Sequence, residues 1–303
     1  MNKVFDCVII GAGPSGIGAA IELKNKGFDV ILIEKSMPGG KINIAPRVDN
    51  YPGFKEIPGP DLAMEFYNRI LSNNINFVGD EIISLDKKDD LFESVGKVGT
   101  YLSKTVYIAT GTTERKIGLP KEDELFGHGL SYCAVCDGHF FKGQDVLLIG
   151  GGNTALKEAI YLAPLVKKLY LIHRRTEFRG SNKLVEELKS FKNVAILTPY
   201  IPVEFIGEDK LSGVKIRNVS SLEERVLDVQ GVFPLVGQNP NTGFIKLDIK
   251  NEYGNIPVDK KMMTSVPGVF SGGDVLPRDI RQIYLAEHDG KVAAKSIEEY
   301  LKA

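Results

Sequence analysis

The sequence has almost no net charge, few cysteines and no long uninterrupted hydrophobic run. Its 38 basic residues nearly balance its 39 acidic residues, leaving a formal net charge of −1. Without a basic excess there is little electrostatic field to attract nucleic acid or an anionic membrane, so we expect neither as a partner. Three cysteines are too few for the disulfide framework of a small secreted protein, which favours a cytoplasmic location.

The chain does contain enough apolar material for a substantial core. With 303 residues, 43% of them hydrophobic, it can form one large domain or two ordinary ones. The first apolar stretch, residues 4–10, contains Asp6 and runs directly into glycine and proline. It therefore has the layout of neither a signal peptide nor a membrane span. We expect Cys7, inside this stretch, to be an unreactive core residue.

Two segments share the pattern of apolar strand, glycine turn, helix and second strand. The first reads FDCVII, GAGPSGIGAAIELKNKG and DVILIE, and the second reads QDVLLI, GGGNTALKEAIYLAPLV and KKLYLIHRR. Gly11 and Glu34 are 23 residues apart, as are Gly150 and His173. The pattern predicts two βαβ units in matching register. Strand-like stretches follow each unit, between 81 and 111 after the first and at 203–219 and 231–242 after the second.

Polar stretches with glycine and proline at 112–118 and 237–243 bracket the second unit and predict linkers. The predicted fold class is α/β with two Rossmann-like dinucleotide-binding domains, each carrying a β-rich insertion. Residues 113–243 would form a domain inserted into a split domain made of 1–112 and 244–303.

The first glycine turn is typical of a dinucleotide pyrophosphate site. Missing side chains let a pyrophosphate approach backbone amides at a helix N-terminus. The residues concerned are Gly11, Gly13, Pro14, Ser15 and Gly16. Glu34 ends the second strand, where a carboxylate accepts hydrogen bonds from a ribose diol and repels a 2′-phosphate.

The second glycine turn lacks an acid at the equivalent strand end. It has the GxGxxA form, with candidate ligands Gly150, Gly152, Asn153 and Thr154. The strand ends instead at HRRTEFR, which contains His173, Arg174, Arg175 and Arg179. Three arginines favour the 2′-phosphate that separates NADP from NAD. The alternative interpretation is a solvated basic helix start.

The segment SYCAVCDGHF, residues 131–140, holds the other two cysteines, Cys133 and Cys136. Their spacing permits a small, reversibly reducible disulfide ring, which suits electron transfer. A buried structural bridge is one alternative. Zinc is another, because His128 and His139 flank the pair and complete a possible set of four ligands.

The whole chain resembles the low-molecular-weight bacterial thioredoxin reductases, within the pyridine nucleotide disulfide oxidoreductases. The resemblance rests on GAGPSG, GG at 39–40, NYPGF, ATG, CAVCDG, GGGNTA, HRRTEFR and GVFSGGDV with RQ, in that order. It implies FAD in the first site and NADPH in the inserted domain. The residues it adds to the cofactor sites are Lys35, Gly39, Gly40, Lys41, Asn50, Thr110, Gly111, Gly273, Asp274, Arg281, Gln282 and Ile283.

The resemblance also implies thioredoxin as the electron acceptor and a homodimer as the assembly. It places Cys136 toward the flavin, Cys133 toward the partner disulfide, and Asp137 as the proton donor to the leaving thiolate. The pair Asp137-Gly138 also reads simply as a turn.

The two half-reactions present a geometric difficulty, because the disulfide and the nicotinamide site lie in one inserted domain and both must reach the flavin. We expect that domain to rotate about the linkers at 112–118 and 237–243. Two alternative functions stay open. One is a reductase of another disulfide protein, fed by NADPH or ferredoxin, and the other is a non-enzymatic redox-sensing or zinc-binding nucleotide protein.

Overall fold

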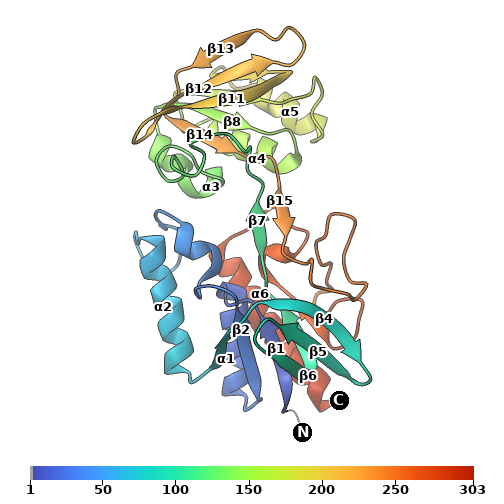
Figure 1. Cartoon of the computed structure of the whole chain (residues 1–303). Coiled ribbons are helices and arrows are strands. Elements are labelled where there is room, and N and C mark those ends of the chain that lie inside the picture. The colour runs from blue at the N-terminus through green and yellow to red at the C-terminus, as the bar shows by residue number, and fades with distance from the viewer. Residues whose placement is uncertain (1–2) are drawn as a thin grey trace. The chain divides into compact units, whose positions relative to one another are not determined.

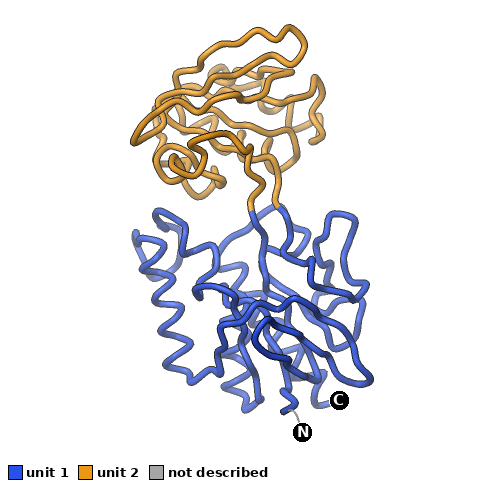
Figure 2. Tube along the Cα trace, viewed as in Figure 1, with its two compact units in different colours: residues 1–113, 239–303 blue, residues 114–238 orange. Residues whose placement is uncertain are grey.

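The computed structural model describes residues 3–303, which divide into two compact units. Unit 1 comprises Met1–Thr113 and Asn239–Ala303, and unit 2 comprises Glu114–Gln238 (Figure 2). The chain leaves unit 1 once and returns to it once, so unit 2 is an insertion in a discontinuous unit.

Unit 1 is built on a seven-stranded sheet (Figure 1). The strand order is β3-β2-β1-β6-β5-β4, and β16 pairs with the C-terminal part of β6. The pairs β3-β2, β2-β1, β1-β6 and β6-β16 are parallel, whereas β4 and β5 form an antiparallel extension. The strands are β1 (Val4–Ile10), β2 (Val30–Glu34), β3 (Asn76–Gly79), β4 (Ile82–Lys88), β5 (Leu91–Gly96), β6 (Thr100–Ile108) and β16 (Val269–Ser271).

Strand β1 is buried on both faces, which explains its continuous apolar run. Cys7 and Ile9 belong to one hydrophobic cluster, and Val8 and Ile10 belong to another. The expectation that Cys7 is an unreactive core residue agrees with its full burial, which raises the pKa of its thiol to about 12.

Among residues 3–303, three α-helices belong to unit 1, namely α1 (Pro14–Asn25), α2 (Gly59–Ser72) and α6 (Ile283–Lys302). Helices α1 and α6 pack against each other. Their approach is close because Gly290 of α6 lies against the backbone of Ser15 and Ala19, where a Cβ atom has no room. Helix α6 is thereby fixed beside the helix that begins at the first glycine turn. The described part of unit 1 also contains the 3-10 helices η1 (Gly40–Ile44) and η3 (Gly273–Val275).

Unit 2 contains a parallel four-stranded sheet with the order β10-β9-β8-β14. A separate antiparallel sheet with the order β11-β12-β13 corresponds to the predicted β-rich insertion. The strands are β8 (Asp145–Ile149), β9 (Lys168–Ile172), β10 (Val194–Leu197), β11 (Tyr200–Gly207), β12 (Leu211–Asn218), β13 (Glu224–Leu227) and β14 (Gly231–Pro234). The helices are α3 (Ala134–Asp137), η2 (Gly138–Phe141), α4 (Asn153–Leu162) and α5 (Asn182–Lys189). The predicted α/β fold with two βαβ units is confirmed.

The two chain segments that join the units run together as a ribbon. Strand β7 (Thr112–Glu114) pairs with β15 (Gln238–Pro240). The pairing extends on either side, through Arg115 N to Gly237 O at 3.0 Å and through Asn241 N to Gly111 O at 3.0 Å. The linkers are therefore tied to each other by backbone hydrogen bonds. Within residues 3–303, no helix has the length and hydropathy needed to cross a bilayer.

Candidate active site

The first glycine turn in unit 1 connects β1 to α1 tightly. Gly11 has a φ of +106° and lies against the backbone of Ala109, so a side chain there is both strained and obstructed. A Cβ atom on Gly16 meets the carbonyl of Gly11. Helix α1 then begins at Pro14 with Gly13 as its N-cap, and no side chain caps it. These features match an N-terminus that binds a pyrophosphate.

Glu34 and the glycine pair at 39–40 hold this turn in place. Glu34 Oε2 accepts a hydrogen bond from the backbone N–H of Ala12 at 2.8 Å. The N–H of Gly39 donates to the carbonyl of Ala12 at 2.7 Å. Gly40, with a φ of +57°, lies close to Gly13, since a Cβ atom on Gly40 comes within 3.4 Å of the Gly13 Cα. The carboxylate predicted at a ribose thus stands directly beside the first glycine turn.

The C-terminal segment brings a carboxylate to the same turn. Gly273 has a φ of +78°, and a Cβ atom added there would lie 3.2 Å from the side chain of Ser15. Lys41 Nζ lies 3.6 Å from the carboxylate of the next residue, Asp274, and donates to Thr112 Oγ1 at 2.8 Å. Residues far apart in the sequence therefore converge on one end of the sheet, as a dinucleotide site requires.

Other predicted residues in unit 1 have separate contacts. Arg281 Nε donates to the carbonyl of Asp274 at 3.3 Å, and Asn50 Nδ2 donates to Gln282 Oε1 at 3.0 Å. Ile283 is the first residue of α6. Thr110 Oγ1 donates to the carbonyl of Asn241 at 2.8 Å, and Gly111 has a φ of +63°. Lys35 is exposed directly after β2, and its charge helps to lower the pKa of Glu81.

A partly buried ion pair that the sequence does not predict stabilises this segment. Asp289 of α6 is 4% exposed, and its Oδ2 accepts from the N–H of Gly273 at 2.8 Å and from Arg278 Nη2 at 2.7 Å. The buried hydroxyls of Tyr107 and Ser15 lie 2.6 Å apart. An aspartate within an amphipathic helix carries no sequence signal for such a contact, because the packing of α6 against η3 brings it to Gly273.

The second glycine turn, in unit 2, connects β8 to α4. Gly150 packs against Leu235 and Ala155, and Gly151 packs against the ring of His173, so neither position has room for a side chain. The carbonyl of Gly151 accepts from the N–H groups of Arg179 and Gly180 at 2.9 and 3.0 Å. The basic segment is therefore bonded directly to the glycine turn.

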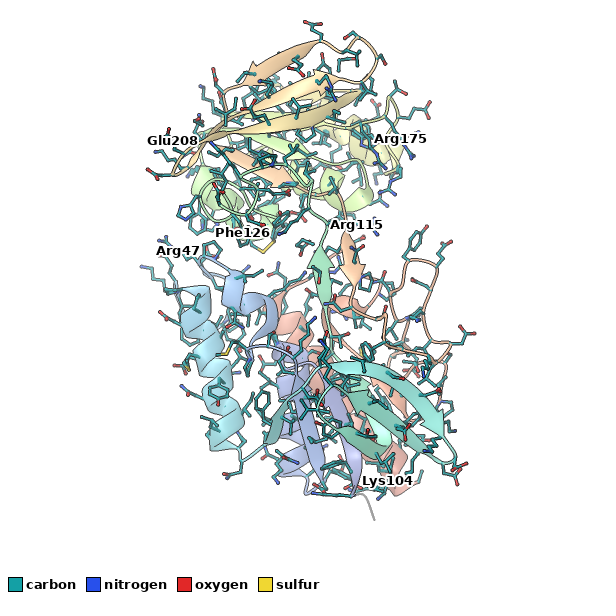
Figure 3. All side chains as sticks on the ribbon, viewed as in Figure 1. Arg47, Lys104, Arg115, Phe126, Arg175 and Glu208 are labelled. Atoms are coloured by element: carbon teal, nitrogen blue, oxygen red, sulfur yellow. A yellow bond between two sulfur atoms is a disulfide. The ribbon has the colours of Figure 1, made fainter. Side chains whose placement is uncertain are left out.

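Side chains around this second turn are mainly basic. Arg174, Arg175 and Arg179 are exposed, and Figure 3 labels Arg175 at the surface of unit 2. His173 is 8% exposed and stacks on Phe178 with ring centroids 5.4 Å apart. Burial lowers the pKa of His173, and the three arginines lower it further, so the imidazole is neutral at pH 7. Positive charge beside the turn therefore comes from the guanidinium groups.

Two further predicted residues begin α4. The side-chain oxygen of Asn153 accepts from the N–H of Ser181 at 2.8 Å, and Thr154 follows in the first turn. Gly152 is the N-cap and has no side chain to cap the helix. A Cβ atom added at Gly152 would lie 3.8 Å from Arg179 Nη2. The structure thus brings the second turn, the start of α4 and the basic segment together within unit 2.

Cys133 and Cys136 form a disulfide, with their Cα atoms 5.3 Å apart. Cys133 is the N-cap of the four-residue helix α3, and its Sγ accepts from the backbone N–H of Cys136 at 3.2 Å. A hydrogen bond of this kind supports negative charge on a sulfur. The geometry therefore distinguishes Cys133 as the sulfur that is better prepared to become a thiolate.

Two side chains next to the disulfide were not identified from the sequence. Ser131, which is 4% exposed, donates from Oγ to Asp137 Oδ2 at 2.6 Å and accepts from the N–H of Cys133 at 3.1 Å. Glu158 Oε2 accepts from the N–H of Ala134 at 2.6 Å. Ser131 lies in the quoted motif but has no special spacing, and Glu158 reads as an ordinary helix-surface acid.

The zinc alternative needs four ligands, His128, Cys133, Cys136 and His139, to lie close together around one ion. Among residues 3–303, no three or more His, Cys, Asp or Glu side chains lie together in a group that could hold a metal ion. The two sulfurs that zinc would need are bonded to each other. The observed arrangement is a disulfide with a hydrogen-bonded carboxylate beside it.

Comparison with known proteins agrees with this arrangement. Residues 5–290 match the family described as pyridine nucleotide-disulphide oxidoreductase. The thioredoxin reductase of Ureaplasma parvum is 39% identical over 99% of this chain and 98% of its own, and that of Mycoplasma genitalium is 40% identical over 97% and 94%. The crystal structure of thioredoxin reductase from Streptococcus pyogenes superposes with a TM-score of 0.93 at 38% identity, covering 100% of this chain and 99% of that one.

The motifs, the fold and the full-length similarity all indicate the same protein family. A flavin and a pyridine nucleotide are the groups that such proteins use, and a disulfide is what they reduce or oxidise. The chain therefore belongs to the pyridine nucleotide-disulphide oxidoreductase family, in its thioredoxin reductase branch.

Proposed function

We propose that the protein is an NADPH-dependent flavoenzyme that reduces the disulfide of thioredoxin. The proposal rests on the Cys133–Cys136 disulfide, which lies in the same chain as two glycine turns. A carboxylate lies beside the first turn and arginines lie beside the second. Full-length similarity to thioredoxin reductases supports the proposal. When bound, the flavin and the nicotinamide supply the two electrons that reduce the disulfide.

The residues present fit FAD in unit 1 and NADPH in unit 2. Glu34 and the uncapped start of α1 suit an unphosphorylated adenosine ribose and a pyrophosphate. Arg174, Arg175 and Arg179 beside the second turn suit a 2′-phosphate. This basic cluster also favours NADPH over ferredoxin as the electron donor.

The chain's own residues account for the exchange with thioredoxin. Once the disulfide is reduced, the Cys133 thiolate attacks one sulfur of the thioredoxin disulfide and forms a mixed disulfide, while the other thioredoxin sulfur leaves as a thiolate. Asp137 supplies the proton to the leaving sulfur. Cys136 then loses its thiol proton to the Asp137 carboxylate and attacks Cys133 Sγ. The mixed disulfide bond breaks, the second thioredoxin sulfur leaves as a thiolate, and the Cys133–Cys136 disulfide and the protonated Asp137 are restored.

Replacing Asp137 by Asn is expected to lower turnover roughly 100-fold, because general acid catalysis is removed. Ser131→Ala, which keeps the carboxylate but removes its 2.6 Å hydrogen bond, should give an intermediate loss. Asp123→Asn, at an exposed aspartate of the same unit, serves as the matched control. The measurement is NADPH-dependent thioredoxin reduction, with flavin absorbance checking that cofactor content is constant. Wild-type turnover in Asp137→Asn would remove the acid role.

We further propose that unit 2 rotates relative to unit 1 during each cycle. The disulfide and the second glycine turn both belong to unit 2, whereas the first turn belongs to unit 1. One fixed orientation would have to present both the disulfide and the nicotinamide to the flavin. The paired strands β7 and β15 are the connection about which rotation would occur.

A reversible cross-link that fixes the orientation of the units is therefore expected to lower turnover at least tenfold. Cleaving the cross-link should restore the activity, which controls for damage caused by the engineered residues. Full turnover with the cross-link in place would contradict the rotation.

A homodimer and a cytoplasmic location complete the proposal. Light scattering that gives the mass of a single chain would exclude the dimer.

A further inference from the structure

Glu158 brings a carboxylate to the residue that directly follows Cys133. It lies on α4, and its Oε2 accepts from the backbone N–H of Ala134 at 2.6 Å. Ala134 directly follows Cys133 and is fully buried, and Glu158 itself is half-buried. Water therefore screens this carboxylate less than it would an exposed one.

The backbone amides around Cys133 have different acceptors. The N–H of Cys136 donates to Cys133 Sγ at 3.2 Å and so supports charge on that sulfur. The N–H of Ala134, at the start of the same short helix, is taken by the carboxylate of Glu158. The start of α3 therefore contains one group that favours a thiolate on Cys133 and one negative charge that opposes it.

Only the reduced state of the pair places charge beside Glu158. Two electrons and one proton break the sulfur–sulfur bond and leave a Cys133 thiolate and a Cys136 thiol. The disulfide is neutral, so repulsion from the carboxylate acts on the reduced state alone. The repulsion makes the dithiol a stronger donor of electrons.

We propose that the charge of Glu158 sets the reducing power of the Cys133–Cys136 pair. The proposal rests on the redox role assigned to this pair above. Glu158 is not itself a catalytic residue, because it acts through the electrostatics of the neighbouring sulfur. Its position on α4, the helix that begins at the second glycine turn, fixes the carboxylate in the same unit as the disulfide.

The test is the redox equilibrium of the full-length Glu158→Gln protein in dithiothreitol buffers at pH 8. Glutamine keeps an oxygen that can accept from the N–H of Ala134 but removes the charge. The two sulfurs are quenched in acid, alkylated and counted by mass spectrometry. The equilibrium constant for reduction is expected to rise roughly three- to tenfold, where tenfold corresponds to about 30 mV.

Two further variants make the result specific. Glu187→Gln removes an exposed carboxylate from α5 in the same unit and should leave the equilibrium unchanged. Glu158→Asp keeps the charge but shortens the side chain by one methylene, so the equilibrium constant should rise less than in Glu158→Gln. This variant keeps the test valid if Glu158→Gln does not fold. An equilibrium equal to wild type in the folded Glu158 variants would overturn the proposal. This equilibrium is measured without thioredoxin or NADPH, so its failure is distinguishable from a failure of the proposed function.

Discussion

Replacing Cys133 and Cys136 together by serine is expected to abolish NADPH-dependent reduction of thioredoxin. Serine preserves size but cannot form the disulfide observed between these positions, so two electrons have no sulfur pair to enter. The expected loss is complete within assay sensitivity, roughly 10⁴-fold or more. The measurement is initial-rate NADPH oxidation with oxidised thioredoxin as the acceptor.

Cys7→Ala is the matched control for this experiment. Cys7 is a fully buried free thiol whose pKa is raised to about 12, so it lacks the thiolate that exchange requires. Its loss should leave turnover within about twofold, provided that the variant folds. Reduction of thioredoxin at the wild-type rate by the double serine variant would show that electrons take another route.

Replacing Arg174, Arg175 and Arg179 together by glutamine should remove the preference for NADPH over NADH. Each guanidinium can give charge-assisted hydrogen bonds to a 2′-phosphate, and such bonds contribute about 1.5–3 kcal/mol each. Because these contributions overlap, the expected increase in KM for NADPH is roughly 1000-fold. NADH lacks the 2′-phosphate, so its KM should change little. Initial rates with both coenzymes measure the effect.

Arg225→Gln provides a control for the loss of positive charge from unit 2. Arg225 is exposed and lies over the ring of Tyr200, with its guanidinium carbon 5.0 Å from the ring centroid. This variant should keep the wild-type ratio of KM values. If the triple variant weakened NADPH and NADH equally, the arginines would be stabilising the fold of unit 2 rather than selecting the coenzyme.

Local pattern was sufficient to predict both βαβ units. The buried strand before Gly11, the helix after it and the strand ending at Glu34 each have a periodicity that neighbouring residues determine. The same is true of the unit that begins at β8. The spacing of 23 residues from each glycine turn to its second strand end placed Glu34 and His173 correctly beside those turns.

Contacts between distant segments could not be predicted in the same way. Asp289 bonds to Gly273 because α6 packs on η3, and Glu158 reaches Ala134 because α4 packs on α3. In sequence, both acids look like polar positions on amphipathic helices. Hydrogen bonds of this kind follow from tertiary packing, which periodicity alone does not determine.

Anaerobic titration with NADPH, followed by thiol trapping, tests most directly whether electrons pass from NADPH into the Cys133–Cys136 pair. One equivalent of NADPH is added to the oxidised protein without oxygen, and the cysteines are alkylated after acid quenching. We predict that alkylation appears at Cys133 and Cys136, whereas alkylation of Cys7, which is a free thiol before and after the titration, stays unchanged. Turnover with thioredoxin in which these two residues stay bonded to each other throughout would contradict the account.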